Sequence, residues 1–203
     1  MSVPDCVLVG RPNSGKTLFL INLCEHLGCG TLELETEGPA GGTLRRRLSP
    51  EEARRLLVGG APQTTVGVQR VLVRIRRGKS GRECRLVDTT GLVESVHPDE
   101  SVRWGMASSI GEMLRGRVVL HLVDASLVRE GAVWWGELEE QMDRYLSLRP
   151  GYAVLANKMD LPEAEAGLRN LLAQTPARRV FPVSALTRAG FREVVDFVRR
   201  HVG

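Results

Sequence analysis

The sequence predicts an α/β fold in which a mostly parallel sheet carries helices on both faces. Short runs of β-branched and other apolar residues alternate with segments of helical periodicity, as in parallel sheets joined by crossover helices. The chain has 203 residues, of which 42% are hydrophobic and 26% charged, and this suits one soluble α/β domain rather than two. We therefore expect a single domain over residues 1–203.

The expected strands are short apolar runs bounded by glycine, proline or charged residues. They lie at residues 6–10, 66–77, 83–90, 118–125, 152–158 and 180–186. The second and third are joined through the sequence GKSG, which favours a hairpin and hence the one antiparallel pairing of the sheet.

Helical periodicity predicts helices between and after these strands. They lie at residues 16–27, 101–114, 135–148, 162–174 and 190–201. Gly28 is expected to stop the first of them. The last places Phe191, Val194, Val195 and Val198 on one face, which should pack on the sheet.

The segment between Gly28 and Thr64 does not follow this alternation. It contains no strong strand signal, yet it exceeds the roughly 12–15 residues at which a structureless loop becomes unusual. The sequence SPEEARRLL predicts a helix inside it, with Ser49 as N-cap, Pro50 in the first turn and Glu52 completing a capping box. The sequence EGPAGGT has the composition of a flexible hinge.

The sequence GRPNSGKT, from Gly10 to Thr17, follows the first strand and opens the first helix. It fits the phosphate-binding pattern G-x-x-x-x-G-K-S/T, in which backbone N–H groups and a helix N-terminus face the phosphates. Lys16 should reach the β and γ phosphates, and the Thr17 hydroxyl should bind Mg²⁺. A chance glycine-rich turn with this pattern would occur roughly once in a few hundred such chains. The expected nucleotide-binding residues of this segment are Asn13, Ser14, Gly15, Lys16, Thr17 and Leu18.

The sequence DTTG closes the third strand. Asp88 is expected to hold Mg²⁺ through a water molecule, and the Gly91 N–H to meet the γ-phosphate. The next residue, Leu92, has no donor or acceptor and cannot orient an attacking water. Either the chain does not hydrolyse a nucleotide, or other groups orient the attacking water.

Two further motifs close the fifth and sixth strands and predict a guanine site. In NKMD, Asp160 can accept hydrogen bonds from the ring N–H and exocyclic amine of guanine, while Asn157 braces the loop and Lys158 covers the base. In SAL, the Ala185 N–H can donate to the guanine carbonyl. Alone, NKMD could be only a helix cap, but all the motifs stand in order at strand ends. The expected nucleotide-binding residues here are Asp88, Gly91, Asn157, Lys158, Asp160, Ser184, Ala185 and Leu186.

Together GRPNSGKT, DTTG, NKMD and SAL resemble the translation-factor class of P-loop GTPases, and within it the Era and tRNA-modification (MnmE) group. The resemblance implies a Ras-like fold, a six-stranded sheet in the order 2-3-1-4-5-6, and a single G domain with an insertion at about 29–63 in the first switch region. The sequence APQTT is similar to the first switch of Era, which makes Thr65 the expected γ-phosphate and Mg²⁺ sensor. The residues from 99 to 126 resemble the second switch and its following strand.

The resemblance implies a slow GTP-hydrolysing switch that binds GTP and GDP, with a protein effector reading the switch regions. The implied catalytic residues are Lys16, Thr65, Gly91 and Asn13, and the implied Mg²⁺ ligands are Thr17, Thr65 and Asp88. Potassium-stimulated members of the group carry an asparagine at the position of Asn13, whose amide oxygen could hold K⁺. The alternative is that Asn13 only shapes the loop in the left-handed conformation.

Two other functions stay open. Leu92 and the lack of room for an effector domain fit a non-catalytic GTP-binding scaffold. The sequence PNSGKT also resembles the G domain of the iron transporter FeoB, which fits a stand-alone G-protein component of a transport system.

The hairpin at 70–85 carries seven basic residues and one acidic one. They are Arg70, Arg74, Arg76, Arg77, Lys79, Arg82, Arg85 and Glu83. RNA or ribosome contact would explain this charge. Protection of an exposed edge strand by charge is the alternative, and it is slightly favoured because no aromatic residues interleave for base stacking.

Composition also favours a cytoplasmic protein. No run approaches the about 18 apolar residues that a membrane span needs, and no basic region precedes the first apolar stretch as in a secretory signal. The four cysteines form no C-x-x-C pair and are expected to be reduced.

Overall fold

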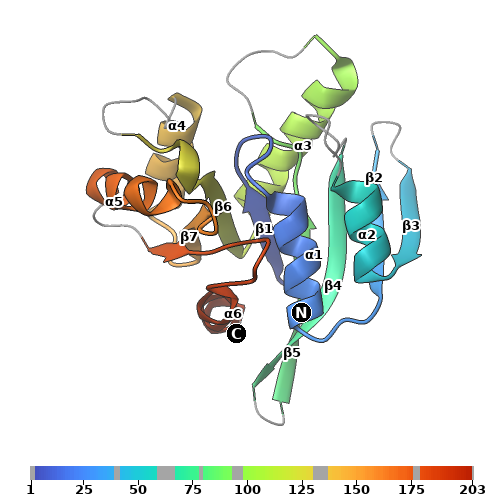
Figure 1. The fold of residues 1–203 in the computed structure, drawn as a ribbon. Coiled ribbons are helices and arrows are strands. Elements are labelled where there is room, and N and C mark those ends of the chain that lie inside the picture. The colour runs from blue at the N-terminus through green and yellow to red at the C-terminus, as the bar shows by residue number, and fades with distance from the viewer. Residues whose placement is uncertain are drawn as a thin grey trace.

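The computed structural model describes residues 3–38, 42–58, 67–77, 80–92, 98–129, 137–175 and 179–202. They form one eight-stranded sheet in the order β3-β2-β4-β5-β1-β6-β7-β8, with helices on both faces (Figure 1). The strands are β1 (Asp5–Val9), β2 (Leu32–Glu37), β3 (Thr43–Leu48), β4 (Val68–Arg77), β5 (Ser80–Asp88), β6 (Val118–Asp124), β7 (Tyr152–Asn157) and β8 (Val180–Pro182).

The expected Ras-like order is confirmed, because β4-β5-β1-β6-β7-β8 corresponds to 2-3-1-4-5-6. The number of strands is wrong, since β2 and β3 add two strands beside β4. The expectation of one antiparallel pairing is also wrong. The pairs β2–β3, β2–β4 and β4–β5 are antiparallel, while β5, β1, β6, β7 and β8 pair in parallel.

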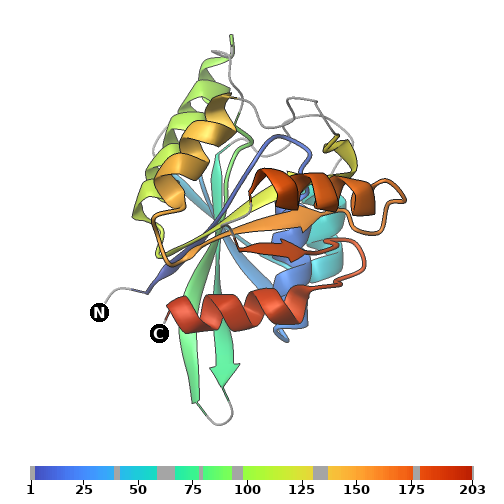
Figure 2. The ribbon, with the colours of Figure 1, turned by 90° about the vertical axis from the view of Figure 1, so that its left-hand side faces the viewer.

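The helices cover the sheet in two layers, which Figure 2 shows from the side. They are α1 (Lys16–His26), α2 (Pro50–Leu57), α3 (Glu100–Arg115), α4 (Glu137–Leu146), α5 (Ala164–Gln174) and α6 (Phe191–His201), with a 3₁₀ turn η1 (Ala125–Leu127). Side chains of α1, α2 and α6 share one apolar core with one face of the sheet. Side chains of α3, α4 and α5 share the other. Among the described residues, no helix is long and apolar enough to cross a membrane.

The two added strands come from the segment in which the sequence showed no strong strand. In β2, Leu32 and Leu34 are buried while the glutamates between and after them are more exposed. The alternation of buried and exposed residues that is typical of a strand is therefore present, but it spans only a few residues. Strand β3 reads TLRRRL and is exposed along its length, which leaves no apolar alternation to detect. Glu37 pairs with Thr43 across the end of this hairpin, so the hinge expected at 37–43 joins two paired strands; residues 39–41 lie outside the described residues.

Helix α2 confirms the predicted capping box. The Ser49 Oγ accepts from the Glu52 N–H at 3.2 Å, and a Glu52 carboxylate oxygen accepts from the Ser49 N–H at 2.8 Å. Ala53 is fully buried, so one face of this short helix joins the core beside α1. The insertion is therefore a folded addition to the sheet over its described residues.

The basic hairpin formed by β4 and β5 extends beyond the rest of the sheet (Figures 1 and 2). Strand β2 pairs with β4 only from Val68 to Val71. Up to Val71, β4 is therefore not an edge strand, and protection of an exposed edge cannot explain its basic residues there. Beyond Val71, where β5 is the partner of β4, that explanation holds.

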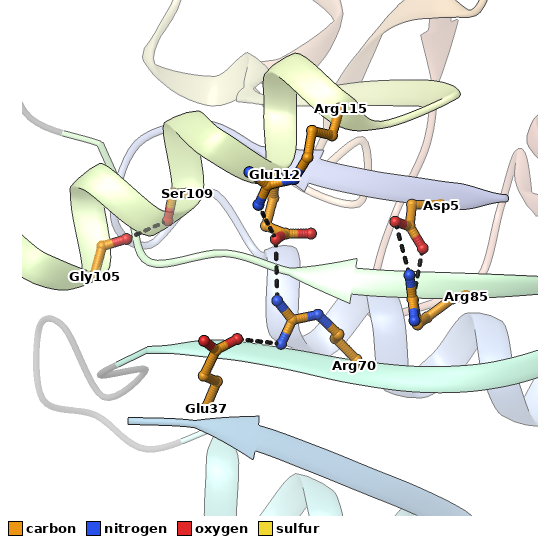
Figure 3. A network of polar contacts seen from close by, with 8 residues as sticks. All are labelled: Asp5, Glu37, Arg70, Arg85, Gly105, Ser109, Glu112 and Arg115. Carbon is orange, nitrogen blue, oxygen red and sulfur yellow. Dashed lines mark hydrogen bonds and ion pairs between the residues drawn. The ribbon is translucent and has the colours of Figure 1, made fainter. Parts of the chain in front are cut away.

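Two of the hairpin's arginines are neutralised within the molecule, as Figure 3 shows. Arg70 contacts Glu37 of β2 at 2.9 Å and Glu112 of α3 at 3.0 Å. Arg85 contacts Asp5 of β1 at 2.6 Å. The net charge that the hairpin offers a partner is smaller than its composition indicates.

The structure differs from prediction in the length of the sixth predicted strand and in which residues of the last helix are buried. Strand β8 covers only Val180–Pro182, and the SAL motif lies in the following turn. In α6, Val195 is only half-buried, whereas Phe197, which the predicted face omitted, is fully buried. All four cysteines are free thiols, as expected.

Candidate functional site

The loop between β1 and α1 has a left-handed backbone and a close side-chain contact at Gly15, and both favour glycine there. Gly15 has φ 94°, and a Cβ there would lie 2.4 Å from the Asn157 side-chain nitrogen. That nitrogen donates to the Ser14 carbonyl at 2.7 Å, so the NKMD motif is bonded to the phosphate loop. Sequence segments more than a hundred residues apart thus meet at the carboxyl edge of the parallel strands.

Lys16 lies at the centre of this loop. Its ammonium is buried and donates to the carbonyls of Gly10 at 3.0 Å and Arg11 at 2.8 Å. Burial lowers the pKa of Lys16 to about 8, and the nearby carboxylate of Asp88 partly opposes this. Among the described residues the Lys16 ammonium donates to carbonyl oxygens, and a buried cation of this kind is a strong attractor for an anionic ligand.

Thr17 and Asp88 form the second part of the site. The Thr17 hydroxyl donates to Asp88 Oδ2 at 2.6 Å. Burial raises the pKa of Asp88 to about 6, although Lys16 and Thr17 both act to lower it. Its other oxygen, Oδ1, is buried and has no hydrogen-bond partner among the described residues. A carboxylate with an unsatisfied oxygen beside a hydroxyl is a donor set that fits Mg²⁺.

The DTTG motif packs directly on the phosphate loop. A Cβ at Gly91 would lie 2.5 Å from the Pro12 backbone nitrogen, so only glycine permits this approach. The Leu92 N–H donates to the Gly10 carbonyl at 3.2 Å, and its side chain is only 2% exposed. Leu92 belongs to the apolar core beneath α3. The leucine is therefore a packing residue in this structure.

The two motifs that are expected to read the base, NKMD and SAL, lie together. Asn157 is 1% exposed, and its Oδ1 accepts from the Ala185 N–H at 2.8 Å. Asp160 accepts a hydrogen bond from the Ser184 hydroxyl, so the NKMD and SAL motifs are joined twice. Because Asn157 already engages the Ala185 N–H, a bond from this N–H to a guanine carbonyl requires sharing it between two acceptors. Leu186 is 64% exposed beside them.

Sequence reasoning missed Asp124 at the end of β6. Its Oδ2 lies 2.6 Å from the Lys158 ammonium, and its Oδ1 accepts from Ser126. Lys158 has φ 67°, so the ion pair accompanies an unusual backbone conformation in the NKMD loop. The one available signal was an aspartate at the carboxyl end of a predicted strand.

Three expected residues are less well defined. Asn13 has φ 62°, which agrees with a loop-shaping role in the left-handed region and leaves the K⁺ prediction untested. Leu18, in the first turn of α1, is partly buried and packs against the apolar core. Thr65, expected to sense the γ-phosphate, lies outside the described residues.

Comparison with known proteins agrees with this geometry. Residues 40–158 match the model of the family described as 50S ribosome-binding GTPase. The GTPase Obg of Shouchella clausii is 35% identical over 123 residues, which covers 58% of this chain and 28% of that protein. The GTPase Obg of Geobacillus thermodenitrificans is 36% identical over 124 residues, with the same coverage. The chain thus spans little more than a quarter of these relatives.

Solved structures share the fold at lower sequence identity. An Aquifex aeolicus Era variant bound to GDP·AlF4⁻ superposes with a TM-score of 0.67 at 19% identity, covering 100% of this chain and 58% of that one. An S. thermophilus NFeoB variant bound to GDP·AlF4⁻ gives a TM-score of 0.59 at 19% identity, covering 97% of this chain and 64% of that one. With more than half of its residues matched by the family model, the chain belongs to the 50S ribosome-binding GTPase family.

Proposed function

We propose that this domain binds GTP with Mg²⁺, hydrolyses it slowly to GDP and phosphate, and acts as a nucleotide-dependent switch. The observation that carries the proposal is the convergence of the four motifs at one sheet edge. Asn157 bonds both Ser14 and Ala185, and Thr17 bonds Asp88. A site built from these contacts offers a buried cation for phosphates at one end and Asp160 for a base at the other.

The proposed roles follow the chemistry of each group. Lys16 and the N–H groups of the phosphate loop bind the β and γ phosphates, and the Gly91 N–H meets the γ-phosphate. Thr17, Asp88 and Thr65 would hold Mg²⁺, which neutralises charge on the phosphates. Asp160 selects guanine, because adenine lacks the two donors that its carboxylate accepts. The remaining proposed contacts are Asn13, Ser14, Gly15, Leu18, Asn157, Lys158, Ser184, Ala185 and Leu186.

Catalysis of phosphoryl transfer depends chiefly on positioning and charge stabilisation. Because Leu92 is buried and apolar, we propose that backbone groups and Thr65 place the attacking water. The Asn13 amide oxygen would bind K⁺, which adds positive charge near the phosphates. Both features lead to slow, cation-dependent turnover.

The same leucine supports a second candidate function. A chain without any side chain to orient water could be a GTP-binding scaffold whose assembly depends on the bound nucleotide alone. A role as the G-protein component of a transport system, suggested by the PNSGKT loop, is a third candidate.

Partners and location are further parts of the proposal. We propose that an effector reads the switch regions and that the exposed arginines of the 70–85 hairpin contact RNA or the ribosome. The family description supports this, as does a structure of Era with 16S ribosomal RNA nucleotides that is 22% identical and shares the fold. Free cysteines fit a cytoplasmic protein. Residues 1–203 would be one G domain whose first switch region carries the insertion at about 29–63.

A nucleotide panel tests the proposal. GDP or GTP at a hundred times its Kd should add about 2.7 kcal/mol of stability, and ATP should add little. Phosphate release is then measured over many turnovers in K⁺ and again in Na⁺. Equal thermal protection by ATP and GTP would remove the guanine assignment. Protection by GTP without any phosphate release would favour the scaffold.

A further inference from the structure

Helix α2 of the insertion contacts α1 on the side that faces the loop between β8 and α6. This loop carries the SAL motif and is called the base-reading loop below. Arg54 of α2 donates through one nitrogen, Nη1, to two residues of α1. These bonds are 2.7 Å to Asn22 Oδ1 and 2.7 Å to Glu25 Oε2. The guanidinium is only partly exposed, so solvent screens these contacts incompletely.

Asn22 connects Arg54 to the SAL motif through a second hydrogen bond. It is 3% exposed, and its Nδ2 donates to the Ala185 carbonyl at 2.6 Å. Its amide has one satisfactory orientation, because the oxygen must face the guanidinium and the nitrogen must face the carbonyl. Without Arg54, the buried amide oxygen loses the donor that fixes this orientation.

Ala185 is thereby held from both sides. Its N–H donates to Asn157 Oδ1 at 2.8 Å, and its carbonyl accepts from Asn22. Asn157 continues the series to the Ser14 carbonyl in the phosphate loop. An unbroken series of hydrogen bonds therefore runs from the insertion to both ends of the nucleotide site.

A second branch anchors the same loop. Arg188 Nη2 contacts the Glu25 oxygen that also accepts from Arg54, at 2.7 Å. Arg188 has φ 66°, and its N–H donates to the Ser184 carbonyl at 2.8 Å. The two arginines, Arg54 first, hold the pKa of Glu25 below its usual value. One guanidinium on α2 thus contacts both residues of α1 that hold the loop.

We propose that Arg54, acting through Asn22 and Glu25, is a positioning residue for guanine-nucleotide retention, so that α2 sets how tightly the base-reading loop is held. The inference rests on the proposed guanine-nucleotide binding. This role gives the insertion a defined function. A partner or substitution that displaces α2 loosens the loop at Ala185 and speeds nucleotide release.

The test measures dissociation of a fluorescent methylanthraniloyl GDP after a chase with unlabelled GDP in Mg²⁺. Arg54→Ala should speed dissociation roughly tenfold, since it removes a charge-assisted hydrogen bond and leaves a buried amide oxygen unpaired. Arg54→Lys, which retains one cationic donor, should recover part of the difference. Arg55→Ala is the matched control, because Arg55 is the exposed neighbour on the same helix.

Three readouts separate positioning from a loss of stability. The preference for guanosine over inosine diphosphate should shrink in Arg54→Ala, because Ser184 in the loosened loop also bonds Asp160. The acceleration caused by chelating Mg²⁺ should stay unchanged, because its ligands lie at the other end of the site. In the double variant with Asn22→Ala, the effect of Arg54→Ala should largely disappear.

The proposed function and the positioning role of Arg54 would be refuted by different results. If the wild type does not bind the GDP probe, the proposed function fails before any variant is made. If the wild type binds it and Arg54→Ala dissociates at the rate of Arg55→Ala, the positioning role is refuted alone. Additive effects of Arg54→Ala and Asn22→Ala would refute the route through Asn22. Should Arg54→Ala not fold, Arg54→Met keeps a long side chain but has no donor for Asn22 or Glu25, and an unchanged rate there would also refute the role.

Discussion

Replacing Leu92 by glutamine places a water-orienting side chain at the position where the chain has leucine. The structure predicts that this change does not restore fast hydrolysis. The Leu92 side chain is 2% exposed and packs in the core beneath α3, while its N–H is fixed on the Gly10 carbonyl at 3.2 Å. A side chain at this position points into the core, away from any water near the phosphates.

The magnitude follows from burial. A buried amide without a partner costs about 1–3 kcal/mol, and part of the apolar burial of leucine, about 1 kcal/mol, is lost as well. We expect Leu92→Gln to destabilise the fold by about 3 kcal/mol, which for a chain of this size lowers Tm by about 6–12 °C. Leu92→Ala should cost a similar amount through the cavity that it leaves. Leu92→Met conserves volume and should cost less than about 1.5 kcal/mol.

The assay combines thermal unfolding with GTP hydrolysis measured well below the lowest Tm. All three variants should hydrolyse GTP within about threefold of the wild-type rate, because none changes a group at the phosphates. A tenfold or greater acceleration by Leu92→Gln, with no loss of Tm, would refute the reasoning. It would show that this side chain leaves the core when GTP binds.

Four further predictions concern the site and its surroundings. Asp160→Asn should weaken GTP binding and admit xanthosine nucleotides, whose extra carbonyl needs a donor; unchanged selectivity in a competition assay would contradict this. Asn13→Ala should abolish any K⁺ stimulation of phosphate release without abolishing GTP binding, and a retained K⁺ effect would exclude a cation at this amide. Thr90→Val removes the hydroxyl that accepts from the Gly67 N–H at 3.2 Å and donates to the Gly67 carbonyl at 3.3 Å. Chemical denaturation should show a loss of about 1–3 kcal/mol in the free energy of unfolding, and Thr90→Ser should lose less. A hydrogen bond from a neighbouring thiol lowers the pKa of Cys29 to about 7, so its thiolate fraction and alkylation rate should rise through pH 7 and level off above pH 8, and mass spectrometry after iodoacetamide should find it modified before the buried cysteines.

The nucleotide site was predictable because its residues obey a topological rule. Carboxyl ends of neighbouring parallel strands meet at one edge, so motifs at the ends of β1, β5 and β7 must lie together. Asn157 illustrates this: the motif order predicts that it lies near the phosphate loop and the SAL motif, and the structure shows it bonded to Ser14 and Ala185. The fate of Leu92 did not follow, because the sequence shows that leucine cannot orient water but not that it is buried.

The residues that sequence reasoning missed depend on packing between elements. Asn22 looks like an ordinary polar residue within a helix, and Arg54 like one of many surface arginines. Their connection exists only because α2 lies against α1, and no spacing along the chain encodes that contact. Asp124 was missed for a related reason, since its partner Lys158 lies in the loop that follows the neighbouring strand β7. Strand β3 was missed because its stability comes from pairing with β2 rather than from an apolar pattern of its own.

The folded insertion changes what a switch in this chain requires. Residues 29–63 have the composition of a loop that could order and disorder with the nucleotide, yet two ion-pair networks hold their described part to the domain. Arg54 binds it to α1, and Arg70 joins Glu37 at the end of β2 to the buried Glu112 of α3. The pairs that join the insertion to the rest of the domain, Arg54–Glu25 and Arg70–Glu37, are partly exposed, so each contributes less than a fully buried pair. Detaching the whole insertion would break both pairs and also the pairing of β2 with β4. We therefore expect any response of the insertion to nucleotide to take the form of small shifts in α2 and β2 rather than detachment.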